Sequence, residues 1–199
     1  MVASPLNKLI LIIGGARSGK SAFGERLAAQ LSDRVLYVAT AQPLDEEMQE
    51  RIHKHRAARP AHWQTLEASL QVGQAIEQRV GPAELVLLDC LTLLVSNAIL
   101  QDGDEATIEK VRPRVEAEVE GLLRVSQKHS KPTIIVSNEV GMGVIPPYPL
   151  GRVYQDLLGW ANQSVAAQAD QVYLLIAGLP VEIKHLIAEV HRGIISSLV

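Results

Sequence analysis

The sequence has a single cysteine, Cys90, among its 199 residues. One thiol excludes a disulfide framework and a zinc site built from cysteines. Long apolar runs are also missing, and those present are too short to span a bilayer. The N-terminal stretch MVASPLNK lacks the shape of a secretory signal, because the apolar run after it leads directly into a glycine-rich loop. We therefore expect a cytoplasmic protein with no stable membrane insertion.

An excess of either charge is likewise absent. The formal net charge is −3 at pH 7 and the pI is near 6.1, which argues against non-specific nucleic-acid binding. The chain also lacks a basic stripe, an internal repeat and a long low-complexity linker. Its residues are 47% hydrophobic and 21% charged, enough to build a sizeable core at this length. We expect a single domain over residues 1–199.

Short apolar runs alternate with longer amphipathic stretches. Because the short runs are continuously apolar, we expect strands covered on both faces, as in a parallel sheet. The predicted strands are Leu9–Ile13, Val35–Ala39, Leu85–Leu88, Thr133–Val136 and Val172–Ile176. The predicted helices are 20–31, 44–57, 67–79, 104–129 and 149–168. This alternation predicts an α/β fold, a mostly parallel sheet with helices on both faces, whose ligands lie beyond the carboxyl ends of the strands.

A phosphate-binding motif follows the first predicted strand. Gly14–Ser21 reads GGARSGKS, which satisfies G-x-x-x-x-G-K-[ST] between a strand and a helix. Glycines let backbone N–H groups surround phosphates, and the helix N-terminus adds positive potential. We expect Lys20 to reach the β- and γ-phosphates and Ser21 to ligate Mg²⁺. A mere glycine-rich turn with a surface lysine is disfavoured, because the complete motif stands in its proper context.

An aspartate ends the third predicted strand, in the stretch LLDC. Asp89 is placed there to hold Mg²⁺ or its waters, although it could instead cap the following turn. Beside the phosphate loop we favour the metal role. Together these motifs predict binding of a nucleoside triphosphate.

Histidines and arginines gather in residues 49–63, QERIHKHRAARPAHW. On a helix, Leu44, Met48, Ile52 and His55 fall on one face, whereas His53 falls on nearly the opposite face. If the last turn persists to Pro60, Arg51 and Arg59 lie four residues before and after His55. This spacing predicts one inward imidazole between two guanidiniums.

Such an imidazole suits attack on a phosphorus atom. Cationic neighbours lower the pKa of a histidine and keep it neutral, and a neutral imidazole is a nucleophile. Arginines also bind phosphate in a bidentate manner. Two alternatives stay open: His55 as a half-buried side chain bonded to a backbone carbonyl, and a metal site from His53, His55 and His62, which no carboxylate pattern completes.

Several stretches together resemble a known family. In chain order they are GGARSGKS, YVATAQPLDEEMQERIHKHRAARPAHW, LLDCLTLLVSN, VSNEVGMGVIP and RVYQDLLGWANQSVAAQADQVYLLIAGLPVEIK, spanning about Leu9 to Lys184. They are similar to the bifunctional adenosylcobinamide kinase/adenosylcobinamide-phosphate guanylyltransferase family of cobalamin biosynthesis. The resemblance implies a RecA-like P-loop NTPase fold and a homotrimer.

The resemblance also implies two reactions on a corrinoid. A nucleoside triphosphate, ATP or GTP, first phosphorylates the aminopropanol hydroxyl of adenosylcobinamide. GTP then guanylylates an enzyme histidine, and GMP passes to adenosylcobinamide phosphate, which gives adenosyl-GDP-cobinamide and pyrophosphate. The family's histidine comes four residues after the arginine of RI-x-x-H, which is His55 here. Pattern and helical geometry therefore favour the same residue.

The family's nucleotide contacts map onto three segments and two acids of this chain. These are Gly14, Gly15, Ala16, Arg17, Ser18, Gly19, Lys20, Ser21, Ala39, Thr40, Ala41, Arg56, Ala57, Ala58, Arg59, Glu67 and Asp89. A carboxylate can accept from guanine N1–H and its amine, and Glu67 is our candidate, with Asp89 the alternative. Without the family likeness, Glu67 would be an acid in the first turn of a helix. Asn138 and Glu139 either handle substrate or metal, or only fix their loop.

Some features depart from the pattern or stay open. Some relatives carry adjacent histidines where this chain has Lys54–His55, and some carry Glu where this chain has Asp89. The tail 185–199 extends beyond the recognised pattern, and it either adds a strand or packs at a subunit interface. Two other functions compete: a RecA-like motor module, and a simple small-molecule kinase with an idle histidine. Neither would form a covalent GMP adduct.

Overall fold

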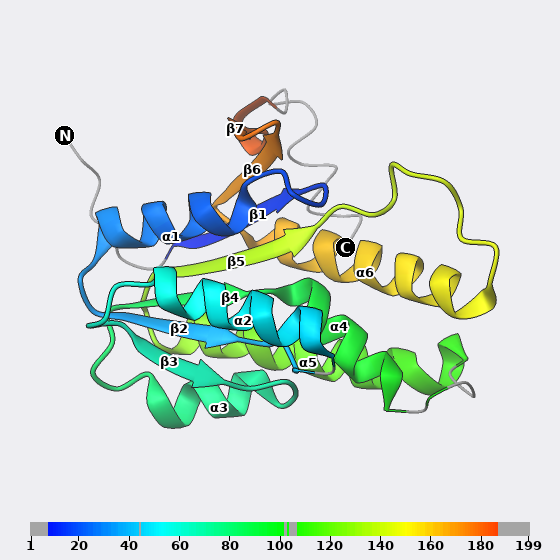
Figure 1. Cartoon of the computed structure of the whole chain (residues 1–199), viewed down its shortest axis with the longest axis horizontal. Helices are drawn as coiled ribbons and strands as arrows, with labels where there is room; N and C mark the ends of the chain where they lie inside the picture. Colours follow the sequence, from blue (N-terminus) through cyan, green and yellow to red (C-terminus); the bar gives the residue numbers. More distant parts are fainter. Residues whose placement is uncertain (1–7, 44, 102, 104–106, 187–199) are drawn as a thin grey trace.

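The computed structural model describes residues 8–43, 45–101, 103 and 107–186. Its centre is a seven-stranded sheet in the order β3-β2-β4-β5-β1-β6-β7 (Figure 1). All neighbouring strands pair in parallel except β6 and β7, which are antiparallel. The strands are β1 (Leu9–Gly14), β2 (Val35–Ala39), β3 (Gln64–Glu67), β4 (Leu85–Asp89), β5 (Thr133–Asn138), β6 (Gln171–Ile176) and β7 (Leu179–Glu182). The predicted mostly parallel sheet is confirmed.

Six α-helices lie in the described part of the chain. They are α1 (Lys20–Leu31), α2 (Glu46–Ala58), α3 (Val72–Arg79), α4 (Leu91–Leu100), α5 (Ile108–Lys128) and α6 (Pro149–Gln168), and a short 3-10 helix, Lys184–Leu186, follows β7. None of these helices combines the length and hydrophobicity that a membrane span requires. Residues 187–199, which make up most of the tail, fall outside the described residues.

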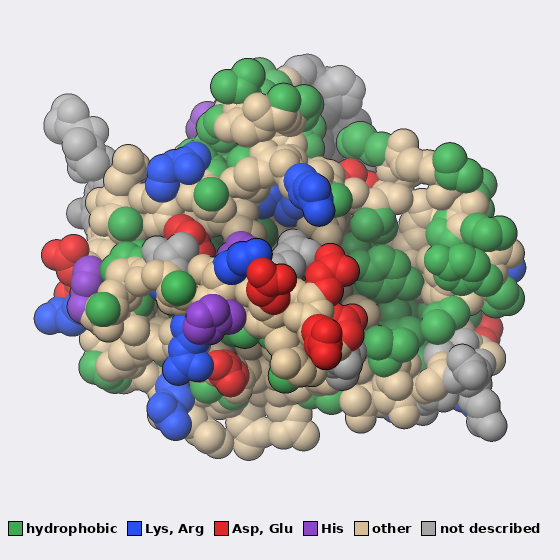
Figure 2. Space-filling model, in the orientation of Figure 1, with side chains coloured by type: hydrophobic (Ala, Val, Ile, Leu, Met, Phe, Trp, Pro, Cys, Tyr) green, Lys and Arg blue, Asp and Glu red, His purple; other side chains and the backbone are tan. Residues whose placement is uncertain are grey.

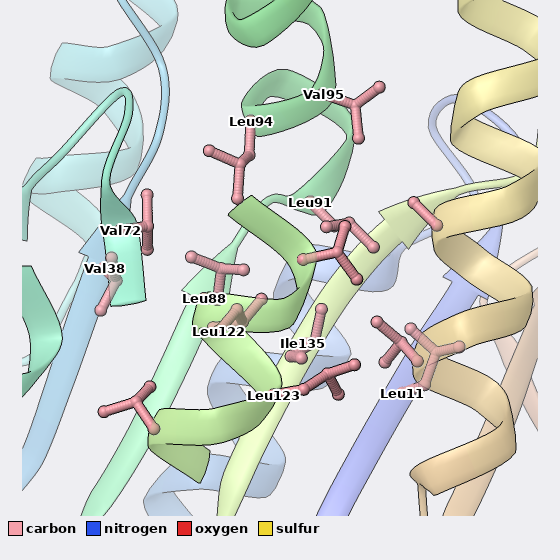
Figure 3. Packing of buried hydrophobic residues seen from close by; sticks show 14 of the residues in the cluster. Leu11, Val38, Val72, Leu88, Leu91, Leu94, Val95, Leu122, Leu123 and Ile135 are labelled. Carbon is pink, nitrogen blue, oxygen red and sulfur yellow. The ribbon is translucent and has the colours of Figure 1, made fainter. Parts of the chain in front are cut away.

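Helices cover both faces of the sheet, as the continuous apolar runs predict. Along β1, Ile10 and Ile12 pack in one buried cluster with Ala28 of α1, while Leu11 packs in another with α3, α4, α5 and α6. This division follows from the strand period of two, which sends successive side chains to opposite faces. Figure 3 shows the second cluster, with Leu11 of β1 among helical side chains such as Leu122.

The structure differs from the sequence prediction in several elements. The predicted helix 67–79 begins only at Val72, and Glu67 instead ends β3. The interpretation of Glu67 as a first-turn helix acid is therefore wrong. Helix α4 and the edge strands β3 and β7 were not predicted. The predicted helix 104–129 is observed as α5 from Ile108, and residues 104–106 lie outside the described part.

The register of the sheet brings predicted site residues to one edge. Ala39 of β2 pairs with Glu67 on one side and with Asp89 on the other. Asn138 at the end of β5 pairs with Gly14 at the end of β1, where the phosphate loop begins. Because these parallel strands end together, their carboxyl ends form one edge of the sheet, where ligands are expected to bind.

Candidate active site

The phosphate loop is shaped by close backbone packing. A Cβ at Gly14 would lie 2.6 Å from the Leu175 carbonyl oxygen, so only glycine fits there. Arg17 and Gly19 have positive φ angles of 57° and 92°. Gly19 therefore opens α1 in a conformation that glycine adopts without steric cost. The loop is further held from outside, because the Gly178 N–H donates to the Ser18 carbonyl at 3.0 Å.

Two polar side chains of the loop, Ser18 and Lys20, are buried. Lys20 is buried and its Nζ donates to the Gly15 carbonyl at 2.7 Å. Ser18 is also buried and Ser21 is half-buried, whereas Gly15, Ala16, Arg17 and Gly19 are exposed. This arrangement leaves backbone groups at the start of α1 facing outward and keeps the lysine charge next to them, which suits phosphate.

Asp89 is held at the end of β4 by a buried tyrosine. The Tyr37 hydroxyl donates to Asp89 Oδ2 at 2.8 Å. Burial, followed by the Asp89 charge, holds the pKa of Tyr37 well above its ordinary value, so this hydroxyl stays a donor. Burial, again followed by the Asp89 charge, raises the pKa of Cys90 to about 11, which keeps that thiol neutral. Asp89 itself is half-exposed and keeps one oxygen for a ligand.

Thr40 has a structural role at the end of β2. It is fully buried, and its hydroxyl both donates to the Cys90 carbonyl at 2.8 Å and accepts from the Cys90 N–H at 2.9 Å. Asn97 of α4 donates to the carbonyls of Thr40 and Ser69 at 2.8 and 3.1 Å. Within the predicted segment Ala39–Ala41, the Thr40 hydroxyl is therefore bonded to the Cys90 backbone, and the expected nucleotide contact of this segment stays a prediction. Ala39 and Ala41 are half-buried.

Three buried polar atoms near this edge of the sheet have no hydrogen-bond partner in the described part of the chain: Ser18 Oγ, Glu25 Oε1 and Arg59 Nε. Glu25 lies one helical turn after Ser21 on α1. Burial first and the Asp89 charge second raise the pKa of Glu25, with Arg59 opposing them. Unpartnered atoms of both charge types beside the loop fit a site completed by a charged ligand.

The donor set also suits magnesium. Mg²⁺ prefers oxygen ligands and usually keeps several waters beside one or two carboxylates and the phosphates of a substrate. Ser21 and Asp89 supply such oxygens. Among the described residues, no three His, Cys, Asp or Glu side chains gather closely enough to hold a metal by themselves. His53, His55 and His62 therefore do not form the metal site considered from the sequence.

Helix α2, which carries His53 and His55 and which we call the histidine helix, begins after an aspartate N-cap, Asp45. Asp45 accepts from the Met48 N–H at 2.7 Å, which satisfies a free donor of the first turn. Met48, Ile52 and His55 are half-buried, while His53 and Lys54 are exposed. The predicted face is therefore confirmed for these residues. Leu44 and the side chain of Arg51 lie outside the described part.

The end of α2 differs from the expectation that Arg59 lies on the same helix as His55, four residues after it. The helix stops at Ala58, and Arg59 is extended rather than helical. Its guanidinium carbon lies 3.4 Å from the centre of the Tyr37 ring, a cation–π contact. Arg59 therefore anchors the helix end over Tyr37 and Asp89 instead of continuing the helix toward Pro60.

Arg56 and Ala57 are exposed on the last turn, and the Ala58 side chain lies outside the described part. Arg56 Nη1 lies 3.6 Å from Glu67 Oε1. Both side chains are largely exposed, so this ion pair contributes little to stability. It does bring two predicted nucleotide-binding residues, from a helix and a strand, next to each other.

Asn138, the last residue of β5, and Glu139, the residue after it, both make hydrogen bonds within the protein. Glu139 Oε1 accepts from the Gly141 N–H at 2.5 Å, which is the loop-fixing alternative considered for Glu139. The Asn138 N–H donates to Thr92 Oγ1 at 2.7 Å, and the Asn138 carbonyl accepts from Asn162 at 2.9 Å.

Sequence inspection missed Tyr37, Glu25 and Asn97. Glu25 carried a signal, namely its spacing of four residues from Ser21. Tyr37 could have been noticed as the one polar tip in the strand VLYVA.

Comparison with known proteins decides the family. The family model described as "Cobinamide kinase / cobinamide phosphate guanyltransferase" matches residues 10–183. The chain belongs to this family. Relatives include the "Bifunctional adenosylcobalamin biosynthesis protein CobU" of Escherichia coli (strain K12), which is 40% identical over 88% of this chain and 99% of the relative. The "Bifunctional adenosylcobalamin biosynthesis protein CobP" of Pseudomonas aeruginosa PAO1 is 43% identical over 87% of this chain and 96% of its own length.

A solved structure bears on the fold alone. The chain matches the structure titled "Structural and biochemical analysis of a prototypical ATPase from the type III secretion system of pathogenic bacteria" with a TM-score of 0.58 and 14% identity. The match covers 96% of this chain and 62% of that one. It agrees with the RecA-like P-loop NTPase fold expected for the cobinamide kinase family.

Proposed function

We propose that this chain phosphorylates adenosylcobinamide and then transfers GMP from GTP to adenosylcobinamide phosphate. The observation that carries the proposal is the shared edge: the phosphate loop, Asp89 and Glu67 stand at the carboxyl ends of β1, β4 and β3, at one edge of a single parallel sheet, in a member of this family. The bifunctional names of its relatives support the pairing of the two activities.

In the kinase step, Lys20 and the N–H groups at the start of α1 hold the β- and γ-phosphates. Ser21 and Asp89 would hold Mg²⁺, which when bound neutralises charge that develops during phosphoryl transfer. Tyr37 fixes the Asp89 carboxylate through its 2.8 Å hydrogen bond. The corrinoid hydroxyl oxygen attacks the γ-phosphorus, the bond from this phosphorus to the β-phosphate oxygen breaks, the nucleoside diphosphate leaves, and the hydroxyl proton passes to solvent.

In the transfer step, an imidazole nitrogen of His55 attacks the α-phosphorus of GTP. A P–N bond forms, the α–β phosphate bond breaks and pyrophosphate leaves, giving a phosphoramidate. A phosphate oxygen of adenosylcobinamide phosphate then attacks the same phosphorus, the P–N bond breaks and the imidazole is restored. His55 is half-buried on α2, which suits a nucleophile that must be both oriented and accessible.

Guanine recognition falls to Glu67 in this account. Its carboxylate ends the edge strand β3 and faces Arg56 across 3.6 Å. An acceptor of this kind pairs with N1–H and the exocyclic amine of guanine and is left unpaired by adenine, which penalises the wrong base. ATP and GTP both stay candidates for the kinase step. The homotrimer, the cytoplasmic location and the lack of nucleic-acid binding stay predictions.

Product analysis tests the proposal. The purified chain is incubated with adenosylcobinamide, Mg²⁺ and either ATP or GTP, and the corrinoids are identified by liquid chromatography and mass spectrometry. We expect adenosylcobinamide phosphate with either donor that the kinase step accepts, and GDP-cobinamide with pyrophosphate only when GTP is present. Phosphorylated corrinoid without any GDP-cobinamide would leave a simple kinase. Nucleotide hydrolysis without a modified corrinoid would contradict both activities.

A further inference from the structure

The loop between β5 and α6 exposes an unusual amount of hydrophobic surface. Residues 140–148, VGMGVIPPY, contain no charged side chain, and we call this segment the apolar loop. Met142, Val144, Ile145 and Tyr148 are 81%, 93%, 71% and 63% exposed. Figure 2 shows hydrophobic side chains along the loop and on the hollowed surface beside it. Exposed apolar patches of this kind mark binding sites rather than packing.

The apolar loop is held in place by its own subunit. Arg152 of α6 donates to the carbonyls of Pro146 and Pro147 at 3.1 and 2.9 Å, and Gln155 donates to the Val140 carbonyl at 3.0 Å. A Cβ at Gly151 would lie 2.7 Å from Pro146, so the loop also packs tightly against the first turn of α6. Backbone anchoring with outward side chains presents a preformed surface, which reduces the ordering cost of binding.

The same loop starts at the phosphate site. The Glu139 N–H donates to the Gly14 carbonyl at 3.0 Å, so the chain enters the apolar loop directly beside the first glycine of the phosphate motif. Beyond its other end, Tyr154 of α6 is half-buried against the core, and burial first and Cys90 second raise the pKa of Tyr154 to about 12. The loop therefore begins at the phosphate motif, and the helix that follows it places Tyr154 near Cys90, the residue after Asp89.

We propose that the apolar loop is the docking surface for the corrin macrocycle of the substrate. This inference rests on the proposed function, because it assigns the second substrate of the same site. A corrinoid is far larger than the hydroxyl arm that reacts, so most of it must lie outside the phosphate site. Its broad apolar faces match the uncharged loop, whereas triphosphates match Lys20 and the start of α1. Docking here leaves the arm free to reach phosphate at the strand ends.

A second apolar surface flanks the phosphate loop and serves as a comparison. The turn between β6 and β7 exposes Ile176 and Leu179, and its Gly178 supports Ser18 through the backbone. This turn contacts the phosphate loop on the side away from β4 and Asp89 in the strand order. We therefore expect it to support the loop without holding the corrinoid.

Neutral substitutions test the assignment without changing electrostatic attraction of nucleotides. Val144→Asn and Ile145→Asn, alone and together, are compared with Leu179→Asn on the second surface and with Leu31→Asn at the far end of α1. Kinase rates are measured against adenosylcobinamide concentration at saturating nucleotide. Self-guanylylation by GTP, which requires no corrinoid, reports the nucleotide site separately.

We expect the double variant to raise the KM for adenosylcobinamide by about tenfold or more, the effect of losing one or two buried apolar side chains. Its self-guanylylation rate and KM for nucleotide should stay within about twofold of wild type, the scatter expected for surface changes. Leu179→Asn and Leu31→Asn should leave the corrinoid KM unchanged.

Three results would overturn the assignment. An unchanged corrinoid KM in the double variant, or an equal rise in Leu179→Asn, would move docking elsewhere. A change in oligomeric mass, measured by light scattering, would make the apolar loop a contact between copies of this chain. If wild type fails to self-guanylylate, the transfer proposal fails, but the kinase measurements still decide where the corrinoid docks.

Discussion

The phosphate loop and the histidine helix α2 lie near the same sheet edge but are built in opposite ways. The loop buries Gly14, Ser18 and Lys20, is fixed by backbone hydrogen bonds, and would bring a Cβ at Gly14 within 2.6 Å of a carbonyl oxygen. Helix α2 has only half-buried or exposed residues where its side chains are described, and its ion pairs, Lys54–Glu50 and Arg56–Glu67, are exposed. Directly after the helix, Arg59 contacts the ring of Tyr37.

This difference separates two parts of the proposed chemistry. The residues that position phosphate are packed against the core, so a substitution in the phosphate loop should lower the rate of every reaction that uses a triphosphate. The proposed nucleophile stands on an element that the core does not need, so changes to its side chain should affect one reaction and leave the fold intact. The predictions below test this separation, from the largest expected effect to the smallest.

Lys20→Ala should reduce both kinase and guanylyl-transfer rates by about a thousandfold or more, because one lysine positions the phosphates in both. Steady-state assays of each reaction measure the effect. Lys54→Ala removes an exposed lysine from α2 and serves as the matched control. A loss confined to one reaction would mean that two separate phosphate sites exist.

His55→Ala should abolish guanylyl transfer and keep at least part of the kinase activity, since only the transfer uses a covalent histidine. Assays with preformed adenosylcobinamide phosphate isolate the second reaction. His53→Ala, an exposed histidine two residues away, should leave both rates near wild type. Full transfer activity in His55→Ala would remove His55 as the nucleophile.

Gly14→Ala should lower the free energy of unfolding by about 1–3 kcal/mol, because the new methyl group must displace the backbone at Leu175. Chemical denaturation with circular dichroism gives the value. Gly15→Ala is the control, since a Cβ there meets no atom within 4 Å. Equal stability of the two variants would show that the close approach at Gly14 carries no strain.

Tyr37→Phe should cost about 1–2 kcal/mol of unfolding free energy, because it removes a hydrogen bond to a carboxylate but keeps the ring under Arg59. It should also raise the Mg²⁺ concentration needed for half-maximal kinase activity, as Asp89 loses its fixed orientation. Asp89→Asn, alone and combined with Tyr37→Phe, completes a double-mutant cycle. Additive effects would mean that the two residues act independently.

Glu67→Gln should change stability by less than about 0.5 kcal/mol, because its ion pair with Arg56 is exposed to solvent. Its effect should appear in base selection instead: the KM for GTP in self-guanylylation should rise while the KM for ATP in the kinase step stays unchanged. Glu50→Gln removes the acid of the other exposed pair on α2 and controls for lost charge. An unaltered GTP KM would remove Glu67 from guanine recognition.

Much of the fold could be predicted because the buried strands are long and continuously apolar. Both bounds of α1 and α6 agree with the sequence prediction, and the five predicted strands appear in place. The edge strands were missed for a physical reason: β3 is four residues of mostly exposed QTLE, and β7 contains Pro180. Neither forms an apolar run. Helix α4, LTLLVSNAIL, is apolar on nearly every side and so shows no helical period.

The candidate site, like the fold, could be predicted from the sequence only in part. The phosphate motif is contiguous, so its residues could be named in advance together with Asp89 at a strand end. Contacts made across the fold had no such signal: Arg59 on Tyr37, Tyr37 on Asp89, and Asn97 on Thr40 join residues from different elements. The family resemblance placed Thr40 among nucleotide contacts, which stays a prediction, and only the fold shows that the Thr40 hydroxyl bonds to the Cys90 backbone.

The covalent intermediate is the most direct test of the account. Intact-protein mass spectrometry would follow wild type and His55→Ala after incubation with GTP and Mg²⁺. We expect wild type to gain the mass of one GMP in an acid-labile linkage, and the variant to gain none. No adduct on wild type, with GTP shown to be bound, would contradict transfer through His55 and leave a P-loop kinase.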